Sequence, residues 1–168
     1  TVVSRDSVRI MLLVAALNDL KVLGADIQNA YLTAPNKEKV WMRAGPEFGH
    51  EEGVVFIVRQ ALYVLKSAGA SFRSFMASKI DDMGFKSSIA DPDVWMRPAV
   101  KSDGEECYEY ILMYVDDILC ISDNGEEIMN EIQRAVKFKN NKVEPPSDYL
   151  GAKLQLKSID GHHCWTMT

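Results

Sequence analysis

Hydrophobic residues recur with helical spacing in three segments of the chain. Residues 4–18 begin with Ser4, a residue type that favours the N-cap position, and carry apolar side chains on one face. Residues 69–83 show the same spacing and are followed by Gly84, which favours a helix end. A third segment begins at Asn124 and places Ile128 and Ile132 one turn apart. The spacing predicts three helices, and two long helices are expected in the fold.

Short apolar or alternating runs between these segments predict β-strands. They are bounded by Gly, Pro and Asn, which favour turns and loops. The predicted strands are residues 21–26, 39–43, 54–58, 94–97, 110–115, 118–121, 149–156 and 163–167. We therefore expect an α+β fold in which a mostly antiparallel sheet packs against the two long helices on one face.

Two adjacent carboxylates interrupt the most apolar pair of strands. Asp116 and Asp117 stand between residues 110–115 and 118–121, so the pattern predicts a hairpin with both acids at its bend. Like charges side by side at a strand end are unfavourable unless a partner compensates them, and Mg²⁺ prefers such hard oxygen ligands. A solvated acidic turn is the plainer interpretation. The long apolar flanks make a metal site about equally plausible.

Composition and charge limit the class of protein. A chain of 168 residues that is 47% hydrophobic has the size of one domain with a proper core. It contains no apolar run of membrane-spanning length, and its start lacks both Met and a signal-peptide pattern. Three cysteines without metal-ligand spacing suggest reduced thiols and an intracellular setting. The net charge of −5 is unusual for a nucleic-acid binder.

A third carboxylate ends another predicted strand. Asp26 closes residues 21–26, so it would approach Asp116 and Asp117 if the two strands are neighbours. Three carboxylates at one end of a sheet can hold two Mg²⁺ ions roughly 4 Å apart, as phosphoryl transfer requires. The ions, rather than the side chains, would then attract the phosphates.

The sequence resembles the reverse transcriptase domain of copia-type LTR retrotransposons. The likeness rests on six blocks in family order rather than on one motif. These blocks are Asp26-Ile-Gln-Asn-Ala-Tyr-Leu32, Val40-Trp-Met with Gly45-Pro-Glu-Phe-Gly49, Gln60-Ala-Leu-Tyr-Val-Leu-Lys66, Met83-Gly-Phe-Lys with Asp91-Pro-Asp-Val-Trp95, Tyr114-Val-Asp-Asp117 and Tyr149-Leu-Gly151. The resemblance implies a polymerase palm with partial fingers, and an RNA-directed DNA polymerase that joins dNTPs to a primer 3′-hydroxyl.

The resemblance also implies a role for individual residues. Asp26, Asp116 and Asp117 would be catalytic and would bind two Mg²⁺ ions, with Mn²⁺ as a possible substitute, and the Ile27 backbone would join the metal ligands. The nucleotide site would comprise Ile27, Gln28, Asn29, Ala30, Tyr31 and Ser67, with Tyr31 rejecting a 2′-hydroxyl. Primer and template would lie along Tyr114, Val115, Leu150, Gly151, Lys66 and Arg73. For Tyr31 a half-buried core aromatic is the alternative, and for Leu150 and Gly151 a plain strand.

Two departures from the family pattern bear on activity. Val64 stands where relatives often have Gly, and Ser67 stands where a Gln helps to position the nucleotide. Val64 would crowd a tight turn, and Ser67 is too short to replace Gln fully. A catalytically inactive remnant with a structural or weak nucleic-acid-binding role is therefore the second hypothesis. An unrelated cyclase-like palm would fit the carboxylates alone.

The resemblance further implies partners and missing segments. Residues 1–168 would be a single domain fragment, with the basic fingers strand before it and the thumb and RNase H after it. Those segments usually bring basic charge, which would reconcile −5 with nucleic-acid binding. The implied partners are a primed RNA or DNA template, dNTPs and the rest of a Pol polyprotein, including integrase and RNase H. No membrane partner is expected, and a cytoplasmic virus-like particle is the implied location.

Overall fold

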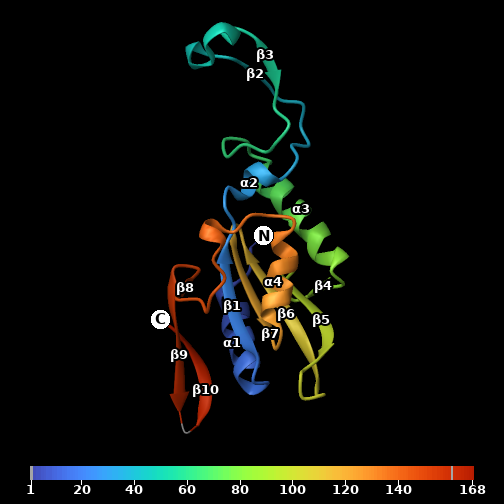
Figure 1. Ribbon diagram of the computed structural model, residues 1–168, viewed down its shortest axis with the longest axis vertical. Coiled ribbons are helices and arrows are strands. Elements are labelled where there is room, and N and C mark those ends of the chain that lie inside the picture. Colours follow the sequence, from blue (N-terminus) through green and yellow to red (C-terminus); the bar gives the residue numbers. More distant parts are fainter. Residues whose placement is uncertain (1, 160) are drawn as a thin grey trace. The chain divides into compact units, whose positions relative to one another are not determined.

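The computed structural model describes residues 2–159 and 161–168 (Figure 1). Backbone contacts divide the chain into two compact units. The sheet unit comprises residues 1–28 and 79–168, and the second unit comprises residues 29–78. That residues 1–168 form a single domain stays a prediction.

A five-stranded sheet forms the centre of the sheet unit. Its order is β1 (Lys21–Asp26), β7 (Asp117–Ser122), β6 (Glu106–Tyr114), β5 (Val94–Val100) and β4 (Lys86–Ser87). Every neighbouring pair is antiparallel (Figure 1). The predicted α+β class with a mostly antiparallel sheet is confirmed.

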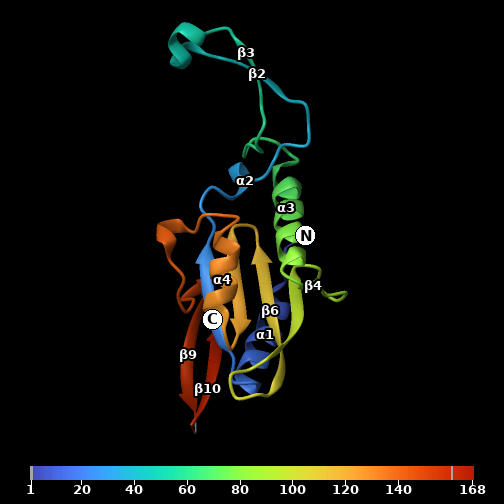
Figure 2. The ribbon, with the colours of Figure 1, turned by 45° about the vertical axis from the view of Figure 1, so that its right-hand side comes forward.

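Helices cover both faces of this sheet. The helix α1 (Arg5–Leu17) packs on one face and α4 (Gly125–Gln133) on the other (Figures 1 and 2). The core on the α1 side contains Val8, Met11, Leu12, Ala15, Leu20, Val22, Val94, Leu112, Leu119, Ile121, Tyr149 and Leu154. On the other face Gly125 lies against Leu23 and Cys120.

The prediction of two long helices on one face is not confirmed, since α1 and α4 lie on opposite faces (Figures 1 and 2). Successive side chains of a strand point to opposite faces. In β1 and β7 both sets are buried, as Leu119 and Cys120 illustrate. A strand that is apolar on both sides needs cover on both sides. The helix α4 has only 9 residues, whereas α1 has 13 and α3 (Ala68–Asp82) has 15.

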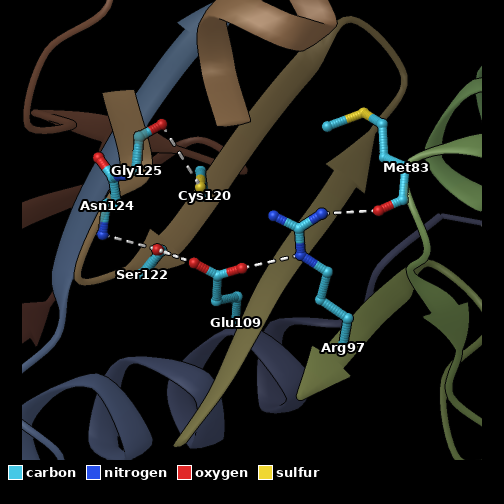
Figure 3. Close-up of polar contacts among 7 residues, drawn as sticks. All are labelled: Met83, Arg97, Glu109, Cys120, Ser122, Asn124 and Gly125. Atoms are coloured by element: carbon cyan, nitrogen blue, oxygen red, sulfur yellow. Dashed lines mark hydrogen bonds and ion pairs between the residues drawn. The ribbon is translucent and has the colours of Figure 1, made fainter. Parts of the chain in front are cut away.

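A buried polar network ties the α4 face of the sheet together (Figure 3). Glu109 accepts hydrogen bonds from Arg97 Nε at 2.8 Å and from Ser122 Oγ at 2.6 Å. Arg97 also donates to the Met83 carbonyl at 2.6 Å, just after α3, and Ser122 Oγ accepts from the Asn124 amide at 2.9 Å, just before α4. Buried charges are tolerated when their hydrogen bonds are satisfied. The network thus joins three strands to the ends of two helices.

A second, three-stranded sheet closes the chain. It consists of β8 (Asp148–Tyr149), β9 (Ala152–Ile159) and β10 (His162–Met167), all antiparallel. The pairing of β9 with β10 was predicted and is confirmed, but the continuous strand over residues 149–156 is wrong. Leu150 and Gly151 form a two-residue turn with φ of +55° and +69°. Leucine rarely adopts this conformation, so nothing in the sequence indicated a turn at this position.

The second unit is smaller and less regular. It contains α2 (Ala30–Thr33), the hairpin of β2 (Trp41–Arg43) and β3 (Val55–Ile57), and the first part of α3. A short 3₁₀ segment, Pro46–Glu51, lies between the two strands. Within the described residues, no helix is both long and apolar enough to cross a membrane.

Candidate active site

The acidic hairpin has a tight, strained turn. Tyr114 and Asp117 form its closing pair, so Val115 and Asp116 are the two turn residues. Val115 has φ +54°, a conformation usually taken by Gly at the first position of a type II′ turn. For a β-branched residue this is unfavourable and is held by the surrounding strands. The turn exposes Asp116 at the tip and places Asp117 at the start of β7.

The end of β1 lies beside this turn. Asp26 is the direct partner of Asp117 in the β1–β7 register, and the Ile27 amide donates to the Asp116 carbonyl at 2.7 Å. Directly opposed residues of antiparallel strands project from the same face. Asp26 and Asp117 therefore share one face, and Asp116 is adjacent in the turn. The condition that these two strands be neighbours, which the sequence left open, is met.

The clustering is electrostatically unfavourable for Asp117. Burial, followed by the negative charges of Asp116 and Asp26, raises the pKa of Asp117 to about 6, and Lys139 opposes the effect. Burial and like charges both disfavour the ionised carboxylate. A carboxyl group perturbed in this way within a cavity is typical of functional sites.

A cation from another part of the chain also reaches the site. Lys139 Nζ lies 3.3 Å from Asp26 Oδ2. The lysine belongs to a short 3₁₀ segment, Lys139–Asn141, that follows α4. Lys139 was assigned no role from the sequence, because no pattern there places it near Asp26. The available signal was Phe138, a buried aromatic residue between two lysines.

A cavity of about 200 Å³ in the sheet unit is lined by Asp26, Asp117 and Lys139. Its wall includes the Tyr149 side chain, whose hydroxyl donates to the Leu112 carbonyl at 3.3 Å. Burial, followed by the charge of Asp117, raises the pKa of Tyr149 well above its ordinary value, so this hydroxyl stays protonated. The remaining lining residues are Gly24, Ala25, Ile118, Leu119, Asn140, Lys142, Glu144, Pro146, Ser147 and Asp148.

The donor set suits a hard divalent cation by its chemistry. Carboxylate oxygens are the ligands that Mg²⁺ prefers. Burial is the main cause of the raised pKa of Asp117, and the charges of Asp116 and Asp26 add a repulsion that a cation would relieve. The ligand geometry is not assembled, however. Among the described residues, no three His, Cys, Asp or Glu side chains are close enough together to hold a metal ion. Asp26 is instead paired with Lys139.

Other predicted nucleotide residues lie in the second unit. Tyr31 packs its ring against Tyr63, with centroids 4.8 Å apart, and against Phe72 at 6.1 Å. A Cβ atom on Gly69 would lie 3.6 Å from the Tyr31 hydroxyl. Tyr31 is thus half-buried among aromatic rings, and its predicted contact with the nucleotide sugar stays a prediction.

The backbone between Asp26 and Tyr31 is partly committed to other contacts. The Ile27 amide donates to Asp116, and the Gln28 amide donates to the Lys137 carbonyl at 2.8 Å. Asn29 adopts a left-handed conformation, with φ +52°, just before α2, and Ala30 is buried. The amides of Ile27 and Gln28 would have to leave these partners in order to bind phosphate.

The two departures from the family pattern behave differently. Val64 is 84% exposed and does not have a positive φ, so the expected crowding at this position does not occur. The Ser67 hydroxyl is buried, and no hydrogen-bond partner is found for it among the described residues. Lys66 is exposed and Arg73 half-buried in the same unit.

The other four predicted primer residues lie in or beside two turns of the sheet unit. Tyr114 and Leu150 pack at the margin of the main core, Val115 is half-buried, and Gly151 is exposed. The Leu150 carbonyl accepts a hydrogen bond from Arg5 at 3.3 Å. The structure therefore places a basic side chain at the β8–β9 turn, which the sequence did not indicate.

Comparison with known proteins finds relatives that match most of the chain. It is similar to the Retrovirus-related Pol polyproteins from transposon TNT 1-94 of Nicotiana tabacum (28% identical, 91% of this chain and 11% of the relative) and from transposon RE1 of Arabidopsis thaliana (28%, 78% and 9%). It is also similar to that of transposon RE2 of Arabidopsis thaliana (29%, 70% and 8%). The chain thus spans about a tenth of the length of these relatives.

A family model described as reverse transcriptase (RNA-dependent DNA polymerase) matches residues 1–162. This match covers nearly the whole sheet unit and all of the second unit. The chain belongs to the reverse transcriptase family.

Proposed function

We propose that this chain is the palm, with part of the fingers, of a copia-type retrotransposon reverse transcriptase. It would extend a primer on an RNA or DNA template by transferring nucleotides from dNTPs. The observation that carries the proposal is the direct pairing of Asp26 with Asp117, with Asp116 in the adjoining turn, in a chain of this family. The similarity to Pol polyproteins supports a place within a longer polyprotein. We propose that this polyprotein also carries integrase and RNase H.

The carboxylates are the proposed metal ligands. Members of the family generally use divalent metal ions, and here Asp26, Asp116, Asp117 and the Ile27 carbonyl would hold two Mg²⁺ ions. Bound there, the ions would activate the primer hydroxyl and stabilise the charge that develops on the phosphates. Asp26 would have to exchange its contact with Lys139 for the metal.

The remaining residues would position the substrates. The strained Val115 turn fixes where Asp116 points, and Tyr114 beside it would pack near the primer end. Leu150 and Gly151 would contact the primer backbone at the β8–β9 turn. Tyr31, supported by Tyr63 and Phe72, would exclude a 2′-hydroxyl. Such fixed placement is the main protein contribution to phosphoryl transfer.

A catalytically inactive remnant is the second candidate, and one observation favours it. Ser67 replaces a nucleotide-positioning Gln, and its hydroxyl finds no partner among the described residues. Val64, by contrast, does not argue for decay, because it is exposed and unstrained.

Primer extension separates the two candidates. The chain, extended at both ends by the neighbouring segments of its polyprotein, is assayed on a primed RNA template with Mg²⁺. An Asp116→Asn/Asp117→Asn variant of the same extended protein, whose fold is checked by circular dichroism, is assayed beside it. Extension by the parent alone supports the polymerase. Absence of extension by both folded proteins supports the remnant, and Ser67→Gln is then the variant expected to restore activity if the loss is recent.

A further inference from the structure

We propose that Lys139 is a built-in counter-cation of the carboxylate cluster, which a divalent metal ion must displace from Asp26 on binding. The inference rests on the metal-binding role proposed above for Asp26 and Asp117. Its starting observation is the ion pair between Lys139 Nζ and Asp26 Oδ2 at 3.3 Å. That carboxylate oxygen is one of the atoms a metal ion would use.

The backbone before Lys139 is fastened to the end of β1. Phe138 is 1% exposed, and it forms an isolated antiparallel bridge with Ile27. The carbonyl of Lys137 accepts a hydrogen bond from the Gln28 amide at 2.8 Å. The backbone at Lys139 is therefore held beside Asp26. The contact of Lys139 with the carboxylate does not depend on the conformation of an unanchored loop.

The backbone after Lys139 is fastened to the same strand. Asn140 and Asn141 both have positive φ values, which turn the chain back sharply. Glu144 then exchanges two backbone hydrogen bonds with Gly24, at 2.7 and 3.2 Å. Residues 137–144 thus follow the outer edge of β1 and are anchored on either side of Asp26. The geometry presents one ammonium group to the carboxylates.

The ion pair between Lys139 and Asp26 is weak enough for a metal ion to displace the lysine. The Lys139 side chain is 64% exposed and that of Asp26 is 42% exposed. Exposed ion pairs contribute little free energy, because water screens them and long side chains lose entropy. A divalent cation bound by several carboxylates has twice the charge and interacts with all of them at once. The metal ion would therefore displace Lys139, at a modest loss of affinity.

Lys142 provides a matched control in the same segment. It also lines the cavity, but it pairs with Glu144 at 2.6 Å. A general effect of removing positive charge near the site would appear equally at Lys139 and Lys142. A specific competition for Asp26 would appear only at Lys139.

The test is direct Mn²⁺ binding to the chain by isothermal titration calorimetry at low ionic strength. We expect Lys139→Met to bind Mn²⁺ about two- to fivefold more tightly than the parent, as the loss of one exposed competing pair implies. Lys139→Arg should keep the parental affinity, and Lys142→Met should change it by less than about 1.5-fold. If Lys139→Met does not fold, Lys139→Gln takes its place.

Each outcome has a distinct meaning. If the parent binds Mn²⁺ and Asp116→Asn/Asp117→Asn does not, but Lys139→Met equals the parent or Lys142→Met, the counter-cation is rejected and the metal site stands. If binding appears only in Lys139→Met, the inference is supported in its strongest form. If neither the parent nor Lys139→Met binds Mn²⁺, both the inference and the proposed metal site are wrong.

Discussion

Asp26 lies directly opposite Asp117 across the β1–β7 ladder, and the amide of the next residue, Ile27, donates to the Asp116 carbonyl. A single strand pairing thus brings Asp26 beside the consecutive carboxylates Asp116 and Asp117, which lie far from it in the sequence. The same pairing creates repulsion, because two of the acids project from one face. The proposed metal site would thus bind a cation at the expense of the stability of the metal-free chain, and this trade-off can be measured.

Asp117→Asn should stabilise the metal-free chain. The folded pKa of about 6 lies above the ordinary 3.8, so the folded state binds the Asp117 proton more tightly than the unfolded state does. The penalty for ionised Asp117 therefore grows as pH rises from about 4 and is complete above about 6. We expect a gain of about 1 kcal/mol at pH 7.5, after allowance for solvent screening, and none below about pH 4. Thermal unfolding of the parent and of Asp117→Asn in EDTA across this pH range measures the difference in stability.

Asp123 is a control with the opposite sign. The Ser102 amide donates to its carboxylate at 2.8 Å, and this hydrogen bond lowers the pKa of Asp123. Its contribution to stability is present above the unfolded pKa, so Asp123→Asn should lower the melting temperature at neutral pH. Equal effects of the two substitutions would show that Asp117 carries no special penalty.

The buried network around Glu109 should dominate the stability of the sheet unit. Glu109→Ala leaves the Arg97 guanidinium without its carboxylate, and we expect a loss of about 3–5 kcal/mol. Arg97→Met combined with Glu109→Leu removes both charges and should recover much of this loss. Urea unfolding measures the free energies.

An exposed ion pair is the matched comparison for this network. Lys86 and Asp81 lie 2.7 Å apart, with more than half of each side chain in solvent. Asp81→Asn should cost less than about 1 kcal/mol. A loss for Glu109→Ala no larger than that for Asp81→Asn would contradict the network's structural role.

Tyr31→Val should weaken discrimination between ribo- and deoxyribonucleotides. The ring is held by Tyr63 and Phe72, so its truncation removes bulk at a fixed place. If Tyr31 excludes the 2′-hydroxyl, the ratio of rNTP to dNTP incorporation should rise roughly tenfold or more, as loss of a steric filter allows. Single-nucleotide primer extension measures this ratio.

Two further substitutions, at Tyr31 and at Tyr63, test this interpretation. Tyr31→Phe retains the bulk and should retain the discrimination. Tyr63→Ala removes the neighbouring ring, and should lower overall activity more than selectivity. A selectivity change as large in Tyr63→Ala as in Tyr31→Val would assign the effect to general loosening of the second unit.

The sequence predicted local elements better than their arrangement. β1 was predicted with its observed bounds, and α1 began and ended within one residue of its prediction, because apolar spacing and the Ser4 cap are local signals. The packing of α1 and α4 on opposite faces (Figures 1 and 2) was not predicted. It depends on β1 and β7 being apolar on both faces, which a short apolar run indicates only when its neighbours in the sheet are known.

The candidate site was predicted in part for the same reason. Asp26, Asp116 and Asp117 stood out as acids at strand ends, and the register later paired Asp26 with Asp117. Lys139 did not stand out, because its position depends on a bridge between Phe138 and Ile27, which are far apart in the sequence. Arg5 at the Leu150 carbonyl was missed for a similar reason. Long-range contacts of single side chains leave no periodic signal.

Leu150→Gly should stabilise the β8–β9 turn. Leu150 has φ +55° and Gly151 has φ +69°, as in a type I′ hairpin turn, where Asn and Gly are preferred. Left-handed backbone costs a non-glycine residue about 1 kcal/mol, and Gly also makes the unfolded chain more flexible. Leu150 packs at the margin of the core as well, so the net gain should be a few tenths of a kcal/mol.

Leu150→Asn and Leu156→Gly complete this test. Asn tolerates the left-handed region without the flexibility of Gly, so Leu150→Asn should be at least as stable as Leu150→Gly. Leu156 is an exposed residue within β9, where Gly should cost about 0.5–1 kcal/mol. Thermal unfolding of the three variants ranks them. A loss at Leu150→Gly as large as that at Leu156→Gly would mean that the Leu150 contacts with the core outweigh the strain of its backbone.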